Sequence, residues 1–142
     1  MYNIRINQIK EKKKMSSINI SNFEKVGDFM EAFNQEVLYV PTLPDFNLAA
    51  LRLDLIEEEV QELRDGLGNQ DLLEIADALT DILYVVYGAG HSFGIDLDDC
   101  FNEVHRSNMT KLGEDGRPLY RDDGKVMKGP NYEEPDLKQF VQ

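Results

Sequence analysis

The chain of 142 residues has little cysteine, few long apolar runs and little positive charge, and each shortage excludes a class of protein. Its one cysteine, Cys100, rules out a disulfide within the chain and fits a reducing compartment, so we expect a cytoplasmic location. No apolar run approaches the ~20 residues of a membrane-spanning helix, and no secretory leader is recognisable. We therefore expect the protein to have no membrane partner.

The shortage of positive charge is large, because 15 Lys and Arg stand against 27 Asp and Glu, a formal net charge of −12. Residues 1–14 alone carry +4, which leaves −16 for residues 15–142. Such a body repels nucleic acid, so we expect no nucleic-acid partner. The change in composition predicts a disordered N-terminal extension over residues 1–20, one helical domain over residues 21–135 and a tail over residues 136–142.

Apolar residues at helical spacing predict four main helices, over residues 22–38, 48–66, 70–87 and 97–108. Ser21 and Glu24 have the spacing of a capping box at the first helix, and Asn47 and Asp96 are the expected caps of the second and fourth. The glycine-rich stretch 88–94 is expected to form a turn, with His91 in it. Asp123-Gly124 predicts a short hairpin between residues 119–121 and 125–127. The fold class is therefore all-α, a four-helix bundle with a hairpin-like C-terminal appendage.

The third expected helix is apolar on nearly every side. From Leu72 to Val86 its polar groups are only Glu74, Asp77, Thr80, Asp81 and the hydroxyl of Tyr84. A helix of this kind is normally buried, and four short helices cannot easily cover it. We therefore expect oligomerisation to complete the bundle, in a homodimer or homotetramer.

Acidic residues form a stripe on each of the two middle helices. Glu58 and Glu59 lie four and three residues before Glu62, and Glu74, Asp77 and Asp81 follow one another at steps of three and four. Like charges at this spacing cost ~0.2–0.5 kcal/mol per pair even in water, so two facing stripes require a hard cation such as Mg²⁺. A solvated acidic face is the alternative interpretation. The apolar residues beside the acids favour the metal site, because a buried carboxylate must be paired, protonated or bound to metal.

The pattern Glu58-Glu59-x-x-Glu62, eleven further residues, then Glu74-x-x-Asp77 resembles the E-E-x-x-E…E-x-x-D signature of the MazG-like, all-α nucleoside triphosphate pyrophosphohydrolases. Residues 103–112 and 123–130 are similar to the phosphoribosyl-ATP-pyrophosphohydrolase-like branch. The resemblance covers residues 23–135. It implies Mg²⁺-dependent hydrolysis of a nucleoside triphosphate to the monophosphate and pyrophosphate, with Mn²⁺ as a substitute ion, in a dimer or tetramer.

The resemblance assigns roles to particular residues. The metal-site positions match Glu58, Glu59, Glu62, Glu74 and Asp77, and Glu58 or Glu59 is the candidate for the base that takes a proton from the attacking water. The negative triphosphate needs positive or neutral donors as well. The candidates for binding the substrate are Asn108, Lys111, Lys125 and Lys128, with Arg106 a weaker one. Ordinary surface charge is the alternative role for Lys125 and Lys128.

Three other functions stay open at this point. Phosphoribosyl-ATP hydrolysis is a different reaction on the same scaffold. A non-catalytic helical dimer that binds nucleotide or metal is a second alternative, although all five signature acids are present. A plain helical interaction module, with the acids on a solvated face, is the third.

Overall fold

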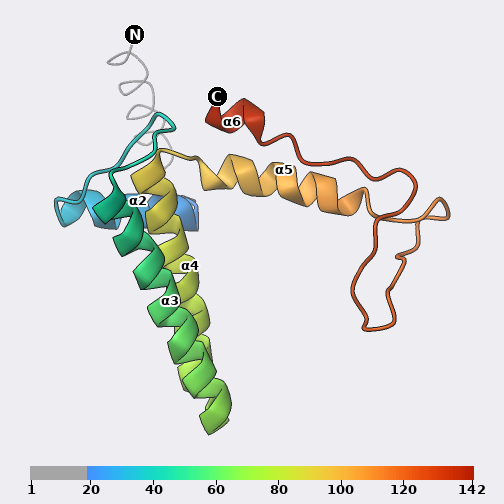
Figure 1. The fold of residues 1–142 in the computed structure, drawn as a ribbon, viewed down its shortest axis with the longest axis horizontal. Coiled ribbons are helices and arrows are strands. Elements are labelled where there is room, and N and C mark those ends of the chain that lie inside the picture. The colour runs from blue at the N-terminus through green and yellow to red at the C-terminus, as the bar shows by residue number, and fades with distance from the viewer. Residues whose placement is uncertain (1–18) are drawn as a thin grey trace. The chain divides into compact units, whose positions relative to one another are not determined.

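The computed structural model describes residues 19–142, so the predicted extension over residues 1–20 falls outside it apart from its last two residues (Figure 1). The helices are α2 (Asn22–Ala32), α3 (Phe46–Asn69), α4 (Leu72–Phe93), α5 (Leu97–Met109) and α6 (Lys138–Val141). Over residues 19–142 the only β pairing is one isolated bridge, Tyr120 with Val126, which confirms the all-α class. None of the helices in this range has the length and apolarity needed to cross a bilayer.

The chain forms two compact units, which divide between Ile95 and Asp96. The first holds α2, α3 and α4, and the second holds α5, the hairpin and α6. The domain predicted over residues 21–135 runs across this division and stays a prediction.

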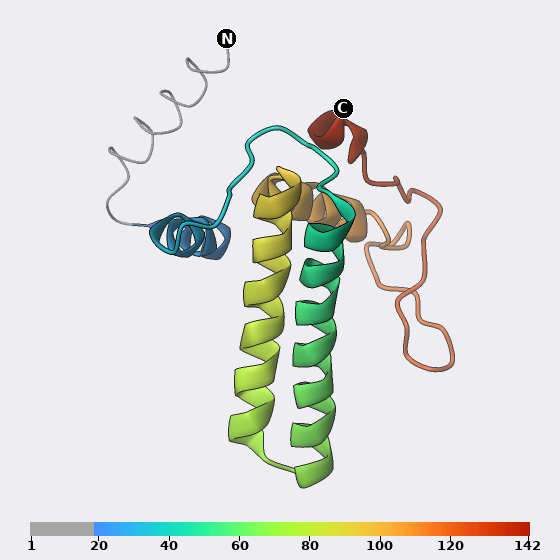
Figure 2. The same cartoon turned by 60° about the vertical axis from the view of Figure 1, so that its left-hand side comes forward.

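In the first unit, α3 and α4 lie side by side as an antiparallel pair (Figure 2). Asp45 caps α3 by accepting from the backbone N–H of Leu48 at 3.0 Å, so the predicted cap at Asn47 is two residues late. Gly66 and Gly68 do not end the helix as predicted, because α3 continues to Asn69 and ends where Gln70 adopts a left-handed φ of 54°. Asp71 then caps α4 through the N–H groups of Leu73 and Glu74. Only two residues therefore separate the helices.

The first predicted helix, 22–38, is too long. The capping box of Ser21 and Glu24 is present, but α2 ends at Ala32 and Asn34 takes a left-handed φ of 58°. The following loop lies against the end of α4, where the N–H of Leu38 donates to the carbonyl oxygen of His91 at 2.9 Å. Apolar residues recur at helical spacing beyond the end of α2 because the loop that follows also has apolar residues to bury. The sequence pattern therefore predicts a helix that is too long.

The predicted turn over residues 88–94 is wrong, because α4 continues as helix to Phe93. Gly88 and Gly90 are buried and allow close packing: a Cβ at Gly88 would lie 3.1 Å from a guanidinium nitrogen of Arg52. His91 is buried rather than in a turn, with its ring stacked on Phe23 at 3.8 Å and its Nε2 2.7 Å from the Phe23 carbonyl oxygen. These contacts join α2 to α4.

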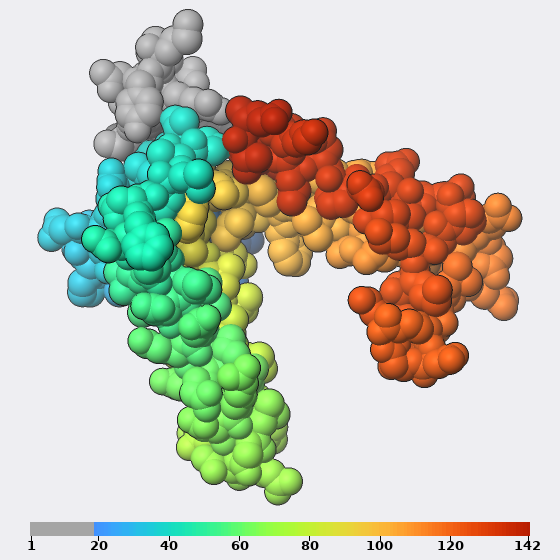
Figure 3. Space-filling view, in the orientation of Figure 1, coloured from blue at the N-terminus to red at the C-terminus, as the bar shows by residue number. Residues whose placement is uncertain are grey.

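The core of the first unit is small, with Phe23, Val26, Met30 and Ala78 as its buried apolar residues. The expectation that the third predicted helix is buried does not hold in the single chain. On α4, Leu72 and Leu73 are each 81% exposed and Leu83 is 53% exposed. In the space-filling view, the end of the helix pair near residues 66–72 stands clear of α2 on the face shown (Figure 3).

In the second unit, α5 agrees with the predicted helix to one residue and begins at the predicted cap, Asp96. The predicted hairpin is also present: Tyr120 pairs with Val126, and Gly124, with φ of 84°, closes the turn by donating to the carbonyl oxygen of Arg121 at 2.8 Å. The predicted tail, 136–142, contains the short helix α6.

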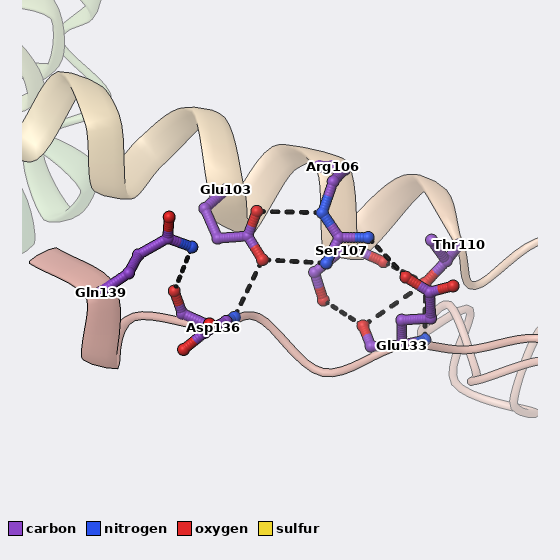
Figure 4. Close-up of polar contacts among 7 residues, drawn as sticks. All are labelled: Glu103, Arg106, Ser107, Thr110, Glu133, Asp136 and Gln139. Carbon is purple, nitrogen blue, oxygen red and sulfur yellow. Dashed lines mark hydrogen bonds and ion pairs between the residues drawn. The ribbon is translucent and has the colours of Figure 1, made fainter.

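Residues 133–136 are held against α5 by a group of polar contacts, which we call the C-terminal clasp (Figure 4). Arg106 lies between Glu103 and Glu133, and the buried Ser107 donates to the Glu133 carbonyl oxygen at 2.8 Å. The N–H of Asp136 donates to Glu103 at 2.9 Å. Thr110 accepts from the N–H of Glu133 at 2.9 Å.

Candidate functional site

Glu59 is the most unusual acid of the first unit. It lies on α3 and is half-buried, and its Oε2 is shielded from solvent and has no hydrogen-bond partner within residues 19–142. A carboxylate oxygen in that position normally needs a donor or a cation. Glu59 therefore marks the point on the α3–α4 pair where a positively charged ligand is most needed.

The surroundings of Glu59 are negative. Burial and the charges of Glu62, Asp81, Glu58 and Asp77, in that order, raise the pKa of its carboxyl above the ordinary value. Two of these neighbours are on α3 and two are on α4, so acids of both helices act on Glu59. The whole of α4 contains no Lys or Arg to offset the charge.

A cavity of about 350 Å³ lies between α3 and α4 toward their connecting turn. It is lined by Glu62, Asp65, Asn69, Glu74 and Asp77. The side-chain amide of Asn69 donates to Glu74 at 3.1 Å, across the turn. At the same place a Cβ on Gly66 would lie 3.1 Å from the backbone nitrogen of Ile75, so glycine lets the two helices approach closely. Three of the five predicted metal-site residues, Glu62, Glu74 and Asp77, thus share this cavity.

Sequence reasoning missed two of the cavity residues, and it placed Asp81, which does not line the cavity, outside the signature. Asp65 and Asn69 follow Glu62 at steps of three and four along α3, so helical spacing alone gave a signal for them. Asp81 is one of the charges acting on Glu59. Which residues of α3 face which residues of α4 depends on the register of the pair, and a single-helix pattern does not contain that information.

The acids are not drawn together into a ready-made ligand set, since residues 19–142 contain no close group of three Asp, Glu, His or Cys side chains suited to a metal ion. The chemistry of the donors nevertheless fits a hard divalent cation. All are carboxylates or an amide, the types of oxygen ligand that Mg²⁺ prefers. The Oε2 of Glu59, which has no hydrogen-bond partner in the described part of the chain, supports the same conclusion.

The second unit holds the predicted substrate-binding residues. Asn108 and Lys111, at the end of α5, line a cavity of about 400 Å³. Lys125 and Lys128 are exposed and do not line it; the Lys128 ammonium lies 4.4 Å from the centre of the Tyr132 ring. Arg106, the weaker candidate, is engaged by two carboxylates in the C-terminal clasp. The structure thus pairs Asn108 with Lys111 and leaves Lys125 and Lys128 apart from that pair.

Comparison with known proteins gives a family match, a curated relative and similar solved structures. The family model described as phosphoribosyl-ATP pyrophosphohydrolase matches residues 26–108. Uncharacterized protein L479 of Acanthamoeba polyphaga mimivirus is 37% identical over 131 residues, which are 89% of this chain and 50% of L479. The chain therefore spans about half the length of this curated relative.

Among solved structures, a protein from Exiguobacterium sp. 255-15, described as a candidate NTP pyrophosphohydrolase, is similar with a TM-score of 0.46 and 23% identity. The similarity covers 84% of this chain and 92% of that one. The matched residues 26–108 include all five signature acids on α3 and α4. The family model matches more than half of the residues of this chain. The chain therefore belongs to the phosphoribosyl-ATP pyrophosphohydrolase family, within the MazG-like nucleoside triphosphate pyrophosphohydrolases.

Proposed function

We propose that the protein hydrolyses a nucleoside triphosphate to the nucleoside monophosphate and pyrophosphate, as a house-cleaning enzyme that acts on phosphoric anhydrides. The observation that carries the proposal is Glu59, whose buried oxygen has no hydrogen-bond partner among residues 19–142 while four other carboxylates act on it. Family membership supports the class of reaction.

Glu58, Glu59, Glu62, Glu74 and Asp77 would hold Mg²⁺ in this enzyme, and Mn²⁺ is a reasonable substitute. When bound, the ion neutralises phosphate charge and makes the phosphorus more electrophilic. Without such an ion, this group of carboxylates would repel a triphosphate.

The chain's own part in proton transfer falls to Glu59 or Glu58. A general base works best when its pKa is near the working pH, and an ordinary glutamate is too acidic for that. Burial and neighbouring charges raise the pKa of Glu59, which makes it the better of the two candidates. In this proposal a carboxylate oxygen of Glu59 that is not bound to the ion accepts the proton of the attacking water.

Asn108 and Lys111 line one cavity and would bind the substrate through a neutral amide and a positive ammonium. Lys125 and Lys128, on and beside the hairpin, would add charge if the hairpin closes over the phosphates. The engagement of Arg106 by Glu103 and Glu133 argues against its use for substrate.

A second copy of the chain is part of the proposal. The apolar residues left exposed on α4, among them Leu79 and Leu83, lie on the same helix as Asp77 and Asp81. A homodimer or homotetramer would bury them and complete the bundle. A cytoplasmic location remains a proposal based on the single cysteine.

Phosphoribosyl-ATP is the second candidate substrate, because the matched family is described by that activity. A non-catalytic nucleotide- or metal-binding dimer is the remaining alternative. Measuring pyrophosphate release from phosphoribosyl-ATP and from the common NTPs and dNTPs separates the three.

The test of the site uses Glu62→Gln and Asp77→Asn, with Glu57→Gln as the matched control. Glu57 is an exposed acid on the same helix and is not one of the charges acting on Glu59. Loss of a ligand should cost several kcal/mol of transition-state stabilisation, a rate loss on the order of 10²–10³-fold. The helical circular dichroism signal should not change. Wild-type pyrophosphate release in either site variant would refute the assignment.

A further inference from the structure

The cavity at the end of α5 is a preformed feature of the second unit. It is lined by Asn108, Met109, Lys111, Leu112, Pro118 and Val126. Its walls are tied together by backbone hydrogen bonds: the N–H of Gly129 donates to the Lys111 carbonyl oxygen at 3.0 Å, and the N–H of Met127 donates to that of Leu119 at 2.8 Å. A Cβ on Gly129 would lie 2.5 Å from the Leu112 carbonyl oxygen, so glycine is required where the hairpin base meets α5. The volume of about 400 Å³ is within the range of small-molecule sites.

The chemistry of this lining is opposite to that of the α3–α4 cavity. In a chain with 27 Asp and Glu, none of the six lining residues is acidic. Four are apolar, and the two polar ones are Asn108, whose side chain carries an amide, and Lys111, whose side chain carries an ammonium. Apolar walls with a few polar groups are typical of sites that orient an organic ligand. A ligand that fits has an apolar body, a polar edge able to pair with an amide, and a negative charge.

We propose that this cavity binds the nucleobase of a nucleotide. The base would lie between the apolar side chains, among them Met109 and Val126. Asn108 would pair with its polar edge, since an amide both donates and accepts, and Lys111 would meet the attached phosphate. The inference rests on the proposed function, because the ligand that it assigns to the cavity is a nucleotide.

The test is binding of nucleosides and nucleoside 5′-monophosphates to the full chain without divalent ions, followed by NMR of the Met109 methyl group and the Asn108 side-chain amide. We expect both signals to shift with a nucleoside, and Lys111→Ala to weaken monophosphate binding about tenfold while leaving nucleoside binding unchanged. Shifts produced by inorganic pyrophosphate but by no nucleoside would overturn the proposal.

Val126→Phe should fill the cavity, and Val141→Phe is its matched control, because the two valines are 45% and 43% exposed and belong to the same unit. Phenylalanine suits an extended position such as 126. We expect the first variant to lose at least tenfold in nucleoside affinity and the second to bind as wild type. Equal affinities in the two variants would overturn the proposal.

The same variants separate this inference from the proposed function. If Glu62→Gln binds nucleosides normally and no nucleotide yields pyrophosphate with wild-type protein, the hydrolase proposal fails and the base site stands. If Val126→Phe binds nucleosides as tightly as the wild-type protein and the wild-type protein releases pyrophosphate from a nucleotide, the base site fails and the hydrolase stands.

Discussion

The position of Glu59 lowers the stability of the fold, and the same position belongs to the candidate site. Its side chain is half-buried beside other acids, an arrangement that costs stability. The neighbouring Glu57, two positions away, is exposed and is not part of this arrangement. A carboxylate kept in such a place despite its cost indicates a functional role, which is the physical basis for assigning it to the site.

Glu59→Gln should therefore stabilise the protein at pH 7 in the presence of a chelator, by about 0.5 kcal/mol. The pKa of Glu59 is raised in the folded state, so its destabilising effect is fully present above that pKa and disappears as the pH falls through it toward the unfolded value. The gain in the free energy of unfolding should shrink accordingly on acidification, as urea titrations at several pH values would measure. Glu57→Gln is the control and should show little change. A gain that is the same at pH 7 and pH 4 would contradict this account.

Glu103 shows the opposite shift for a different reason. Hydrogen bonds from Arg106 and from the backbone of Asp136 lower the pKa of its carboxyl to about 2. Its contribution to the C-terminal clasp is therefore fully present above the ordinary glutamate pKa and is lost as the pH falls through about 2.

Arg106→Gln should move the pKa of Glu103 upward, because the largest cause of the lowering is removed. A carbon-13 NMR titration of the Glu103 carboxyl measures it directly. Arg117→Gln, an exposed arginine of the same unit, should leave the titration unchanged. An unchanged midpoint in Arg106→Gln would mean that the clasp does not depend on this ion pair.

At the scale of elements, the end of α4 is fixed by Gly94. This residue has a φ of 66°, and a Cβ added to it would overlap the carbonyl oxygen of Val40. The loop after α2 is hydrogen-bonded along the same helix end, through Leu38 and Thr42. Gly94 therefore sets both where α4 stops and where the loop crosses it.

Gly94→Ala should destabilise the first unit by more than the ~1–3 kcal/mol of a residue in a strained backbone conformation, because the steric overlap adds to that strain. Gly68→Ala is the control with the opposite expected sign: it lies in α3 with open space around it and should gain about 0.5–1 kcal/mol from helix propensity. Denaturant unfolding followed by circular dichroism compares the two. Similar stabilities would show that the loop can move away from Gly94 at little cost.

Sequence patterns that involve only neighbouring residues predict much of the order of the elements. The capping box of α2, the cap at Asp96 and the hairpin at Asp123-Gly124 depend on neighbouring residues and are present as expected. The ends of α2 and α4 were misplaced, because a loop packed on α4 keeps apolar spacing and because Gly88 and Gly90 serve helix packing.

The candidate site likewise has one part that the sequence predicts and another that depends on packing between elements. The stripe formed by Glu58, Glu59 and Glu62 follows from helical spacing within one element. The cavity shared with Asp65 and Asn69 depends on how α3 is set against α4. The lining of the cavity at the end of α5 depends on the close approach of Gly129 to the end of that helix. No local sequence pattern predicts this cavity.

At the scale of the whole molecule, the first unit leaves much of its apolar surface open. Besides the leucines of α4, Phe33 and Phe46 are 64% and 84% exposed. An apolar surface of this kind on a charged chain typically marks an interface. We therefore expect the active form to contain at least two copies.

Sedimentation velocity at micromolar concentration should show no dominant monomer in the wild-type protein. Leu83→Arg should shift the distribution toward monomer and lower activity, because a charge would be placed in the proposed interface. Leu43→Arg, in the loop and 88% exposed, is the control and should not change it. A fully active wild-type monomer would contradict the expectation.

The two-residue connection between α3 and α4 restricts how the length of this chain can vary among its relatives. Eleven residues separate Glu62 from Glu74, and nine of them are helical. One residue inserted between Glu62 and the end of α3, or between the start of α4 and Glu74, would rotate the acid of that helix by about 100° about the helix axis. That acid would then no longer face the acid of the other helix. Seven residues make nearly two full turns, so relatives with a longer helix pair should carry matched additions of about seven residues on each side of the connection.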